Sequence, residues 1–471
     1  MTTTSWKSGI NGDWNTAANW TAGVPAAGIG ALITAKGTYT VTSDGLNSTG
    51  TLDMAKGATL DVTGLQLTIA SGTGTGALAG NIAVSNAILA LGGGSQSTTF
   101  DNTGTIRLAS ASFIGIADDV ELSGKGKVDL SGGTIASNGN PAGLLNDDTL
   151  FGIGTIGDSN LTLANATKGV IDADSGTGPI VGALTLAAAQ VNNLGLLEAT
   201  GIGILELENE IMNTPKAKIE TKGSGTAIRL DGATVENGVI TIGKDSTLSS
   251  ADGSALAPTK PIKNGGLIDA TEGSLRIVAA VKNSKTATIT ADNNTSVELQ
   301  GAVTGGAAVI NGSGAIDFEG PSSAAVNFAT GSTGALVLGD APQFTGSVAG
   351  MSGNSSVSII LENIPFADNP VVSPLSSKGI LTVTDPVTHV VDSIKIVGTG
   401  SFTASAGPLG TTAISDPPAG SPSAPGNSAQ LLAQSMASFG TASSATAPRN
   451  GDLVDHRRSS DFLAPNAHPH G

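Results

Sequence analysis

Five acidic residues have the type and spacing that a polysaccharide-cleaving site would need. Each directly follows an aliphatic residue in a short apolar–polar segment, and they are Asp172, Glu198, Glu220, Asp269 and Asp317. Glycoside hydrolysis requires paired carboxylates about 5 to 9 Å apart. If the segments stack in register, we expect the five side chains to lie in one row on an outward face. A glycan hydrolase or lyase that uses this row is one hypothesis for the function.

The alternation of apolar and polar residues gives the same row a simpler interpretation. A strand with one buried face places a polar residue at every second position, whatever the role of that residue. Thr241 and Thr290 occupy equivalent positions and offer no carboxylate. The pattern therefore favours a solvated strand face without catalytic residues, and the carboxylate site is the alternative.

Other catalytic chemistries have few residues to use. The chain has no cysteine, which excludes thiolate nucleophiles and thiolate metal sites. None of its four histidines lies between residues 26 and 330, which excludes a His-based triad or a His-ligated zinc site there. The glycine-rich stretches 71–76 and 92–94 lack the Gly-Lys-Ser/Thr of a phosphate-binding loop. We predict no cofactor and no metal ion.

A repeat must position the acidic side chains. Aliphatic residues at the centres of similar segments recur about every 24 residues, a period typical of solenoids. They are Ile171, Leu197, Ile219, Ile240, Ile268, Ile289 and Ile316. Each segment alternates apolar and polar residues, and glycine or asparagine interrupts the pattern at turn spacing. No stretch between residues 30 and 400 has the length and periodicity of a crossover helix.

The sequence therefore predicts an all-β fold, a parallel β-helix solenoid with one coil per repeat and capped ends. About 14 coils at about 4.8 Å spacing would make a rod on the order of 70 Å long. We interpret the asparagines before several strands, such as Asn165 and Asn264, as turn residues with no further role. The register also predicts that Glu206 and Arg229 are neighbours on adjacent coils, in an exposed ion pair worth at most about 1 kcal/mol.

The charge balance limits the possible partners. The chain has 22 Lys and Arg against 38 Asp and Glu, a net charge of −16. An anionic surface repels phosphate backbones and anionic lipid headgroups, so we expect neither nucleic acid nor a membrane surface as partner. No apolar run approaches the ~18 residues of a spanning helix, which predicts no membrane span.

The two ends of the chain differ from the repeats. All three tryptophans lie close to the start of the sequence, which predicts a Trp-rich N-terminal cap at residues 1–25. The predicted solenoid of repeated coils spans residues 26–330, and a C-terminal β segment at 331–418 closes it. Residues 419–471 form a flexible linker, a short amphipathic helix and a tail that we expect to be mostly disordered.

Three segments at these ends resemble known proteins. The C-terminal part contains Leu336-Val-Leu-Gly-Asp-Ala-Pro-Gln-Phe-Thr-Gly-Ser-Val-Ala-Gly350 and Gly410-Thr-Thr-Ala-Ile-Ser-Asp-Pro-Pro418, and the opening contains Gly12-Asp-Trp-Asn-Thr-Ala-Ala-Asn-Trp20. These residues resemble the terminal segments of large secreted β-helical proteins of alphaproteobacteria, and the opening is similar to that of autotransporter-like passengers. The resemblance implies a secreted or surface-exposed β-helix, favours a right-handed coil and identifies no active site.

The route of export is a separate expectation. The start of the sequence lacks the basic and apolar regions of a classical signal peptide. Leu432, Met436 and Phe439 would share one face of a helix in the C-terminal tail. We expect such a helix to serve as an uncleaved type I secretion signal.

Taken together, the sequence favours a secreted or cell-surface structural protein of the adhesin type. Its partner would be an extracellular glycan, a host or neighbouring-cell surface, or a second copy of itself. The glycan-degrading β-helix enzyme is the alternative. A viral tail-fibre-like module is a third hypothesis, for which the sequence offers no evident trimerisation segment.

Overall fold

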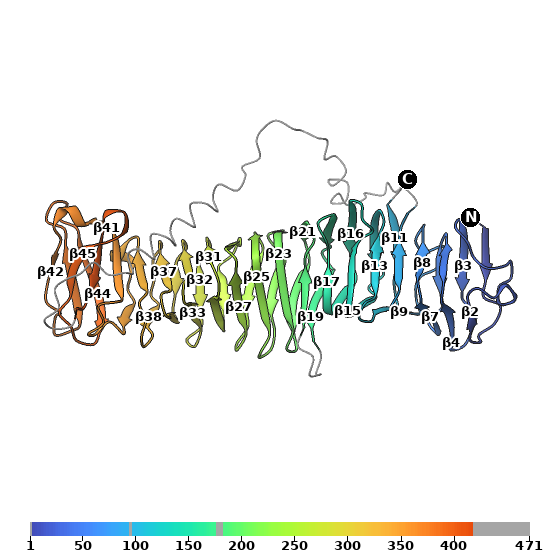
Figure 1. Ribbon diagram of the computed structural model, residues 1–471, viewed down its shortest axis with the longest axis horizontal. Helices are drawn as coiled ribbons and strands as arrows, with labels where there is room; N and C mark the ends of the chain where they lie inside the picture. The colour runs from blue at the N-terminus through green and yellow to red at the C-terminus, as the bar shows by residue number, and fades with distance from the viewer. Residues whose placement is uncertain (1, 94–96, 176–181, 418–471) are drawn as a thin grey trace, which may run out of the picture.

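The predicted all-β parallel solenoid is confirmed. The computed structural model describes residues 2–93, 97–175 and 182–417, and it forms a β-solenoid of about 15 turns. Coils stack along the long axis of the molecule from the N-terminal end to the C-terminal end (Figure 1). The flexible linker, short amphipathic helix and tail expected at 419–471 lie outside the described residues. Among the residues described, no helix has the length and apolar character needed to cross a membrane.

Each coil contributes strands to up to three sheets, which we call faces 1, 2 and 3. Within a face, each strand pairs in parallel with the equivalent strand of the next coil. Face 1 comprises β2 (Gly12–Asp13), β4 (Tyr39–Ser43), β7 (Ala58–Thr63), β9 (Asn81–Ser85), β12 (Thr105–Leu108), the first parts of β15 (Lys127–Ser137) and β17 (Thr149–Ile156), β19 (Val170–Asp174), β22 (Leu196–Thr200), β24 (Lys218–Thr221), β26 (Val239–Ile242), β29 (Ile262–Asn264), β32 (Val281–Asn283) and β35 (Val303–Thr304).

Face 2 follows face 1 along the chain in each coil. It comprises β5 (Leu46–Thr49), β8 (Gln66–Ile69), β10 (Ile88–Leu91), β13 (Phe113–Ile116), the second parts of β15 and β17, β20 (Ala183–Leu186), the first parts of β23 (Ile204–Asn213) and β25 (Ala227–Glu236), β27 (Thr247–Ala251), β30 (Leu267–Ala270), β33 (Thr288–Ala291), β36 (Ala307–Ile310), β38 (Ala325–Phe328), β40 (Ser347–Ala349) and β44 (Val391–Val397).

Face 3 completes the coil. It comprises β11 (Thr98–Asp101), β14 (Asp119–Ser123), β16 (Ala142–Asn146), β18 (Leu161–Asn165), β21 (Gln190–Asn193), the second parts of β23 and β25, β28 (Ser254–Ala257), β31 (Ser274–Ile277), β34 (Ser296–Leu299), β37 (Ala315–Phe318), β39 (Ala335–Leu338) and β41 (Ser358–Pro365). In the first coils, β1 (Thr2–Ser5), β3 (Ile29–Ile33) and β6 (Leu52–Met54) form a separate three-stranded parallel sheet.

Aliphatic columns fill the interior because every strand alternates inward and outward side chains. Leu197, Ile219 and Ile240 are register partners on successive coils of face 1, and each is at most 2% exposed. Burial of apolar surface in such stacked rows stabilises the fold by roughly 25 cal/mol for each Å² removed from water. The narrow core runs through all described coils, so its stability depends on contacts between neighbouring coils.

The predicted column of aliphatic residues is correct only in part. Ile171 does align with Leu197. Ile268 and Ile289, however, belong to face 2, where Ile268 pairs with Leu248 of the preceding coil. Ile316 belongs to face 3 and pairs with Val297 of the preceding coil.

The error arises because the three strands of one coil share the same alternation of residues. The step from residue 240 to residue 268 covers one coil and a third of the next, so the predicted uniform period of about 24 residues is wrong. The steps between register partners are 26 residues from Ile171 to Leu197, 22 from Leu197 to Ile219 and 21 from Ile219 to Ile240.

The predicted neighbourhood of Glu206 and Arg229 is confirmed. The two residues are register partners on β23 and β25, and Arg229 Nη1 lies 3.1 Å from Glu206 Oε1. The Arg229 side chain is 46% exposed, which limits the worth of the pair to at most about 1 kcal/mol.

The interpretation of the asparagines as simple turn residues is wrong for Asn165 and Asn264. Asn165 belongs to a buried ladder in which each side-chain Nδ2 donates to Oδ1 of the next asparagine, at 2.8 to 2.9 Å. The ladder runs through Asn146, Asn165, Asn193 and Asn213, at the ends of β16, β18, β21 and β23. Asn264 Nδ2 donates to Asn283 Oδ1 at 2.9 Å in the same way. Asn237 does occupy a left-handed turn position, with φ of 59°.

The three tryptophans pack against one another at the N-terminal end. Trp6, Trp14 and Trp20 are each at most 4% exposed, and Trp20 meets both of the others edge to face, with ring centroids 5.1 and 5.0 Å away. Trp20 Nε1 donates to the Trp14 carbonyl at 2.7 Å. A short 3-10 helix, η1 (Ala17–Asn19), lies within this segment.

The C-terminal end changes from parallel to antiparallel pairing. β41 pairs with β46 (Thr411–Ser415), which pairs in turn with β45 (Thr403–Ala406). β43 (Ile380–Thr384) pairs with β42 (Val371–Val372) and with β44. These strands occupy an edge that would otherwise expose unpaired backbone groups. Three 3-10 helices complete this end, and they are η2 (Ala341–Gln343), η3 (Phe366–Asp368) and η4 (Pro408–Gly410).

Candidate functional site

The structure divides the five predicted carboxylates among three faces. Asp172, Glu198 and Glu220 are register partners on β19, β22 and β24, so this part of the predicted row is correct. Asp269 lies on face 2, where its register partners are Ser249 and Thr290. Asp317 lies on face 3. The prediction of one common row is therefore wrong for Asp269 and Asp317, for the same reason that the predicted uniform period is wrong.

An ion-pair network neutralises most of the face 1 row. Lys222 Nζ lies 2.7 Å from Glu198 Oε2 and 2.8 Å from Glu220 Oε1. Hydrogen bonds to these two carboxylates raise the pKa of Lys222 above its usual range. One ammonium group engages both carboxylates, so they do not form a free acid–base pair.

Asp172 completes the row in a different environment. The pKa of Asp172 is raised to about 6, chiefly by burial and also by the charge of Glu198, against the hydrogen bond from Thr200. Thr200 Oγ1 donates to this carboxylate at 3.0 Å from each oxygen. Both oxygens of the Asp172 carboxylate thus have a hydrogen-bond partner on the neighbouring strand.

Removing the shared ammonium group should destabilise face 1. We expect Lys222→Met to lower the free energy of unfolding by about 1 kcal/mol at pH 7, because Glu198 and Glu220 then face each other unneutralised on adjacent strands. The raised pKa of Lys222 means that its contribution is fully present at pH 7 and would be lost only at pH values above the usual range of lysine. Urea unfolding of both proteins at pH 7 and pH 3.5 measures the effect.

The measurement at pH 3.5 and a matched control variant test whether the loss of stability comes from the Lys222 ion pairs. Below about pH 4 ordinary carboxylates take up protons, so the difference between Lys222→Met and the parent should shrink there. Exposed Lys218, at the start of the β24 strand that directly precedes Lys222, provides the control, and Lys218→Met should change stability by less than about 0.5 kcal/mol. Equal losses in both variants, or a loss that does not depend on pH, would contradict the network.

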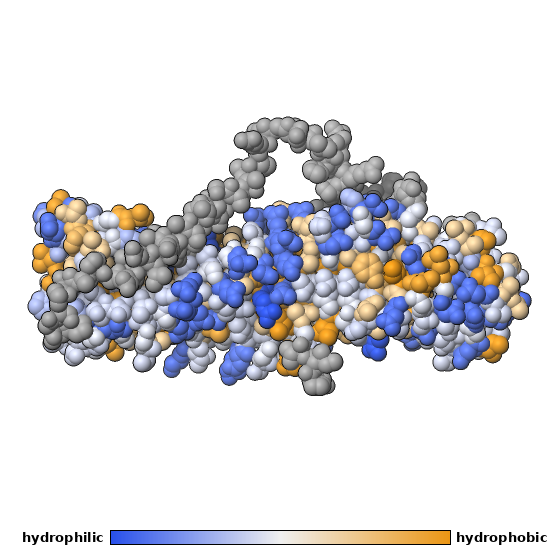
Figure 2. Space-filling view, in the orientation of Figure 1, coloured by the Kyte–Doolittle hydropathy of each residue, from blue (hydrophilic) through white to orange (hydrophobic). Residues whose placement is uncertain are grey.

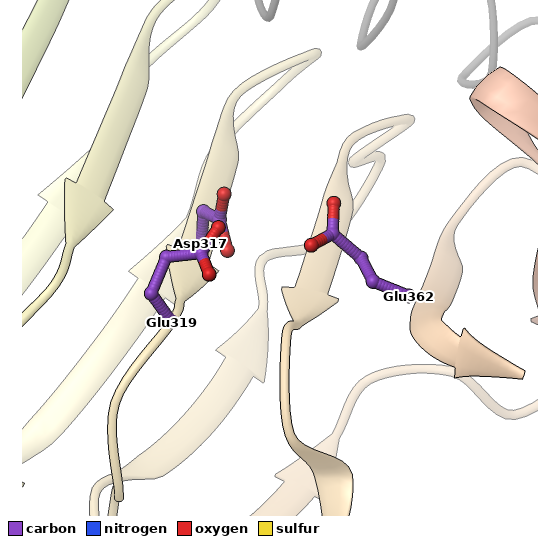
Figure 3. A group of neighbouring side chains, drawn as sticks. All are labelled: Asp317, Glu319 and Glu362. Atoms are coloured by element: carbon purple, nitrogen blue, oxygen red, sulfur yellow. The ribbon is translucent and has the colours of Figure 1, made fainter.

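A second acidic group lies on face 3 near the C-terminal end (Figure 3). Asp317, Glu319 and Glu362 each contribute one carboxylate oxygen, and these three oxygens all lie within 4.8 Å of one another. We call these residues the acidic cluster. Asp317 lies on β37, Glu319 follows the end of that strand, and Glu362 comes from β41, two coils farther along.

A glycine on the intervening coil makes room for the acidic cluster. Leu338 of β39 pairs with Phe318 on one side and with Leu361 on the other, so Gly339 lies between Glu319 and Glu362. A Cβ atom at Gly339 would lie only 2.8 Å from Glu319 Oε2. The missing side chain lets the two glutamates approach across the strand.

Mutual repulsion and burial perturb all three members of the acidic cluster. The pKa of Asp317 is raised to about 8, chiefly by burial, and the charges of Glu319, Glu362 and Glu298 contribute to this shift. Burial also raises the pKa values of Glu319 and Glu362, and each is raised further by the charge of Glu298.

Burial of Asp317 limits what the acidic cluster can do as a catalyst. Asp317 is 8% exposed, and its Oδ1 has no hydrogen-bond partner. A general acid must reach the glycosidic oxygen of its substrate, which this carboxyl group does not do. Close carboxylate oxygens are also the ligands that hard cations prefer.

Sequence reasoning identified Asp317 but missed Glu319 and Glu362. Glu319 stands two residues after Asp317, and the alternation of a strand places both on the same side, so its proximity was available from the sequence. Glu362 is 45 positions from Asp317, and only the register of β37, β39 and β41 brings it near. A period of about 24 residues does not supply that register.

Comparison with known proteins gives no assignment. No family model matches the chain, and we find no match to a curated protein or to a solved structure.

Proposed function

We propose that the protein is a structural or adhesin-like rod, secreted or exposed at the cell surface, that binds through its repeated faces. The continuous parallel register is the observation that carries this proposal, because equivalent outward positions recur once per coil along about 15 turns. A solenoid of this kind offers an extended surface that binds by area and repetition. Its partner would be an extracellular glycan, a host or neighbouring-cell surface, or a second copy.

The character of the surface supports a binding role. Hydrophilic and apolar side chains are interspersed along the length of the rod on the face seen in Figure 2. The anionic net charge of −16 disfavours polyanionic partners. The resemblance of both ends to secreted β-helical proteins of alphaproteobacteria supports the proposed location.

Glycan cleavage is the second candidate, and the acidic cluster is the observation that favours it. A carboxyl group with a pKa of about 8 beside other carboxylates has the electrostatics of a glycosidase acid. Against this stand the burial of Asp317 and the engagement of Glu198 and Glu220 by Lys222.

A glycan panel distinguishes the two candidates. We expect saturable binding of the purified chain to one or more polysaccharides, without release of reducing sugar or unsaturated product. Measurable turnover that is lost in Asp317→Asn or Asp172→Asn, and kept in the exposed control Glu210→Gln, would replace the structural role by the enzymatic one.

A fractionation experiment tests the location. The full chain, produced in the cells that encode it, should be found in the medium or be accessible to protease on intact cells. The same chain lacking residues 419–471 should remain inside the cells. Retention of the full chain in the cytoplasm would refute the proposed location, and equal export of both chains would refute the role of the tail.

A further inference from the structure

The acidic cluster has the composition and geometry of a cation site, and it is independent of the proposed function. Two oxygens that each lie 2.3 to 2.6 Å from one Ca²⁺ ion can be at most about 5 Å apart. The three carboxylate oxygens of Asp317, Glu319 and Glu362 meet this condition, since they lie within 4.8 Å of one another. Figure 3 shows Glu362 facing the other two carboxylates across the intervening strand.

The negative charge of the acidic cluster has no counterpart from the protein. In the described parts of the chain, no ion pair joins a lysine, arginine or histidine to any of its three members. Arg276 is the nearest basic residue along this register column, and its Nε lies 3.8 Å from Glu298 Oε1. Arg276 also donates to Gln300 Oε1 at 3.3 Å. Arg276 therefore interacts with Glu298, which lies one coil before Asp317, and not with the acidic cluster itself.

Asp317 supplies an independent indication of a ligand. The residue is 8% exposed, and its Oδ1 is buried without a hydrogen-bond partner. A buried oxygen without a partner costs about 1 to 3 kcal/mol or more if charged. The outward Val337 and Ile360 beside it are 0% and 1% exposed, so the surroundings are poor in polar partners. A bound cation would satisfy this oxygen.

The intervening glycine leaves room for the carboxylates of the acidic cluster. Gly339 lies in the turn after β39 and does not have a positive φ, so no left-handed backbone demands glycine at this position. Its effect is steric, because a Cβ would meet the Glu319 carboxylate that reaches toward Glu362.

We infer that Asp317, Glu319 and Glu362 bind a Ca²⁺ ion that ties the last parallel coils together. Three carboxylates offer up to six oxygens, which matches the six to eight that Ca²⁺ takes. The absence of histidine and cysteine from the acidic cluster disfavours Zn²⁺ and other transition metals. The ion would link β37 to β41, the strand on which the antiparallel C-terminal end is built.

Calorimetric titration of the full chain, stripped with chelator beforehand, tests this assignment. We expect Ca²⁺ to bind with one equivalent per chain and to raise the thermal midpoint by about 3 °C or more at saturation. Glu362→Gln should weaken binding at least tenfold, and Glu210→Gln, an exposed carboxylate of the same face, should not. Gly339→Ala, which changes no charge, should weaken binding as well.

Unfolding of the metal-free proteins shows whether a loss of Ca²⁺ binding comes from a loss of folding. Removing a negative charge from the acidic cluster relieves repulsion, so Glu362→Gln without metal should unfold at the parent's temperature or higher. The inference is overturned if the parent shows no saturable Ca²⁺ binding, if Glu362→Gln binds Ca²⁺ as tightly as Glu210→Gln, or if Mg²⁺ or Zn²⁺ binds more tightly than Ca²⁺.

Discussion

Trp20→Ala is expected to lower the free energy of unfolding of the N-terminal coils by about 3 to 5 kcal/mol. Trp20 is 1% exposed and is the central ring of the three, with Trp6 and Trp14 edge to face on either side. The substitution removes both aromatic contacts and the hydrogen bond from Trp20 Nε1 to the Trp14 carbonyl. Alanine leaves a cavity that the flanking indoles fill only partially, because the backbone N–H groups of Trp6 and Trp14 are bonded to the carbonyls of Leu32 and Thr42.

The position of the tryptophans gives this prediction a specific measurement. Tryptophan fluorescence reports on the N-terminal end alone, because the chain has no other tryptophans. The fluorescence transition of Trp20→Ala should move to lower denaturant, while hydrogen exchange of β37 and β39 should change little, since coils contact only their neighbours. The exposed Ile10, at 63%, provides the control, and Ile10→Ala should leave the transition unchanged.

Two outcomes would contradict the role of Trp20. An unchanged fluorescence midpoint would mean that the indole cluster contributes nothing to the stability of the first coils. Uniform loss of hydrogen-exchange protection along the whole rod would mean that the end controls the unfolding of every coil.

The sequence sufficed for the fold class because the strand pattern is local. Alternation within four or five residues, and turns rich in glycine and asparagine, do not depend on which coil a strand joins. The same locality explains the neighbourhood of Glu206 and Arg229, which lie one coil apart on strands with matching Leu-x-Leu and Ile-x-Leu patterns.

Assignment of strands to faces could not be derived in the same way. Ile240 and Ile268 have nearly identical surroundings in the sequence, yet they lie on faces 1 and 2. Corner lengths decide the face, and corners are set by backbone geometry rather than by the apolar pattern. The acidic cluster was missed for this reason, since Glu362 approaches Asp317 only when β39 is counted as a coil between them.

Asn165→Ala is expected to lower the free energy of unfolding by about 2 to 4 kcal/mol. Asn165 is fully buried and lies in the middle of the asparagine ladder. Its Oδ1 accepts from Asn146 Nδ2 at 2.9 Å, and its Nδ2 donates to Asn193 Oδ1 at 2.9 Å and to the Leu196 carbonyl at 3.1 Å. Alanine deprives these buried groups of a partner at a corner where water does not replace it.

The neighbouring Asn192 makes the effect of burial measurable. Asn192 is partly exposed on the same β21 strand as Asn193, and Asn192→Ala should change stability by less than about 0.5 kcal/mol. Urea unfolding and hydrogen exchange of β18 to β24 compare the two variants. Similar losses in both, or none in Asn165→Ala, would show that the ladder is incidental to the corner.

Asn165→Asp separates hydrogen bonding from shape. Aspartate keeps the size of the side chain but loses the Nδ2 donations to Gly169, Asn193 and Leu196, and it places a charge in a fully buried site. Burial favours the neutral form, so the folded chain would bind the proton more tightly than the unfolded chain, and the stability of this variant should fall as pH rises above about 4. The Ala variant should lack this pH dependence. If amide-to-amide hydrogen bonds hold the coils together, the parent should be the most stable of the three proteins at pH 7. The Asp variant should then be no more stable than the Ala variant.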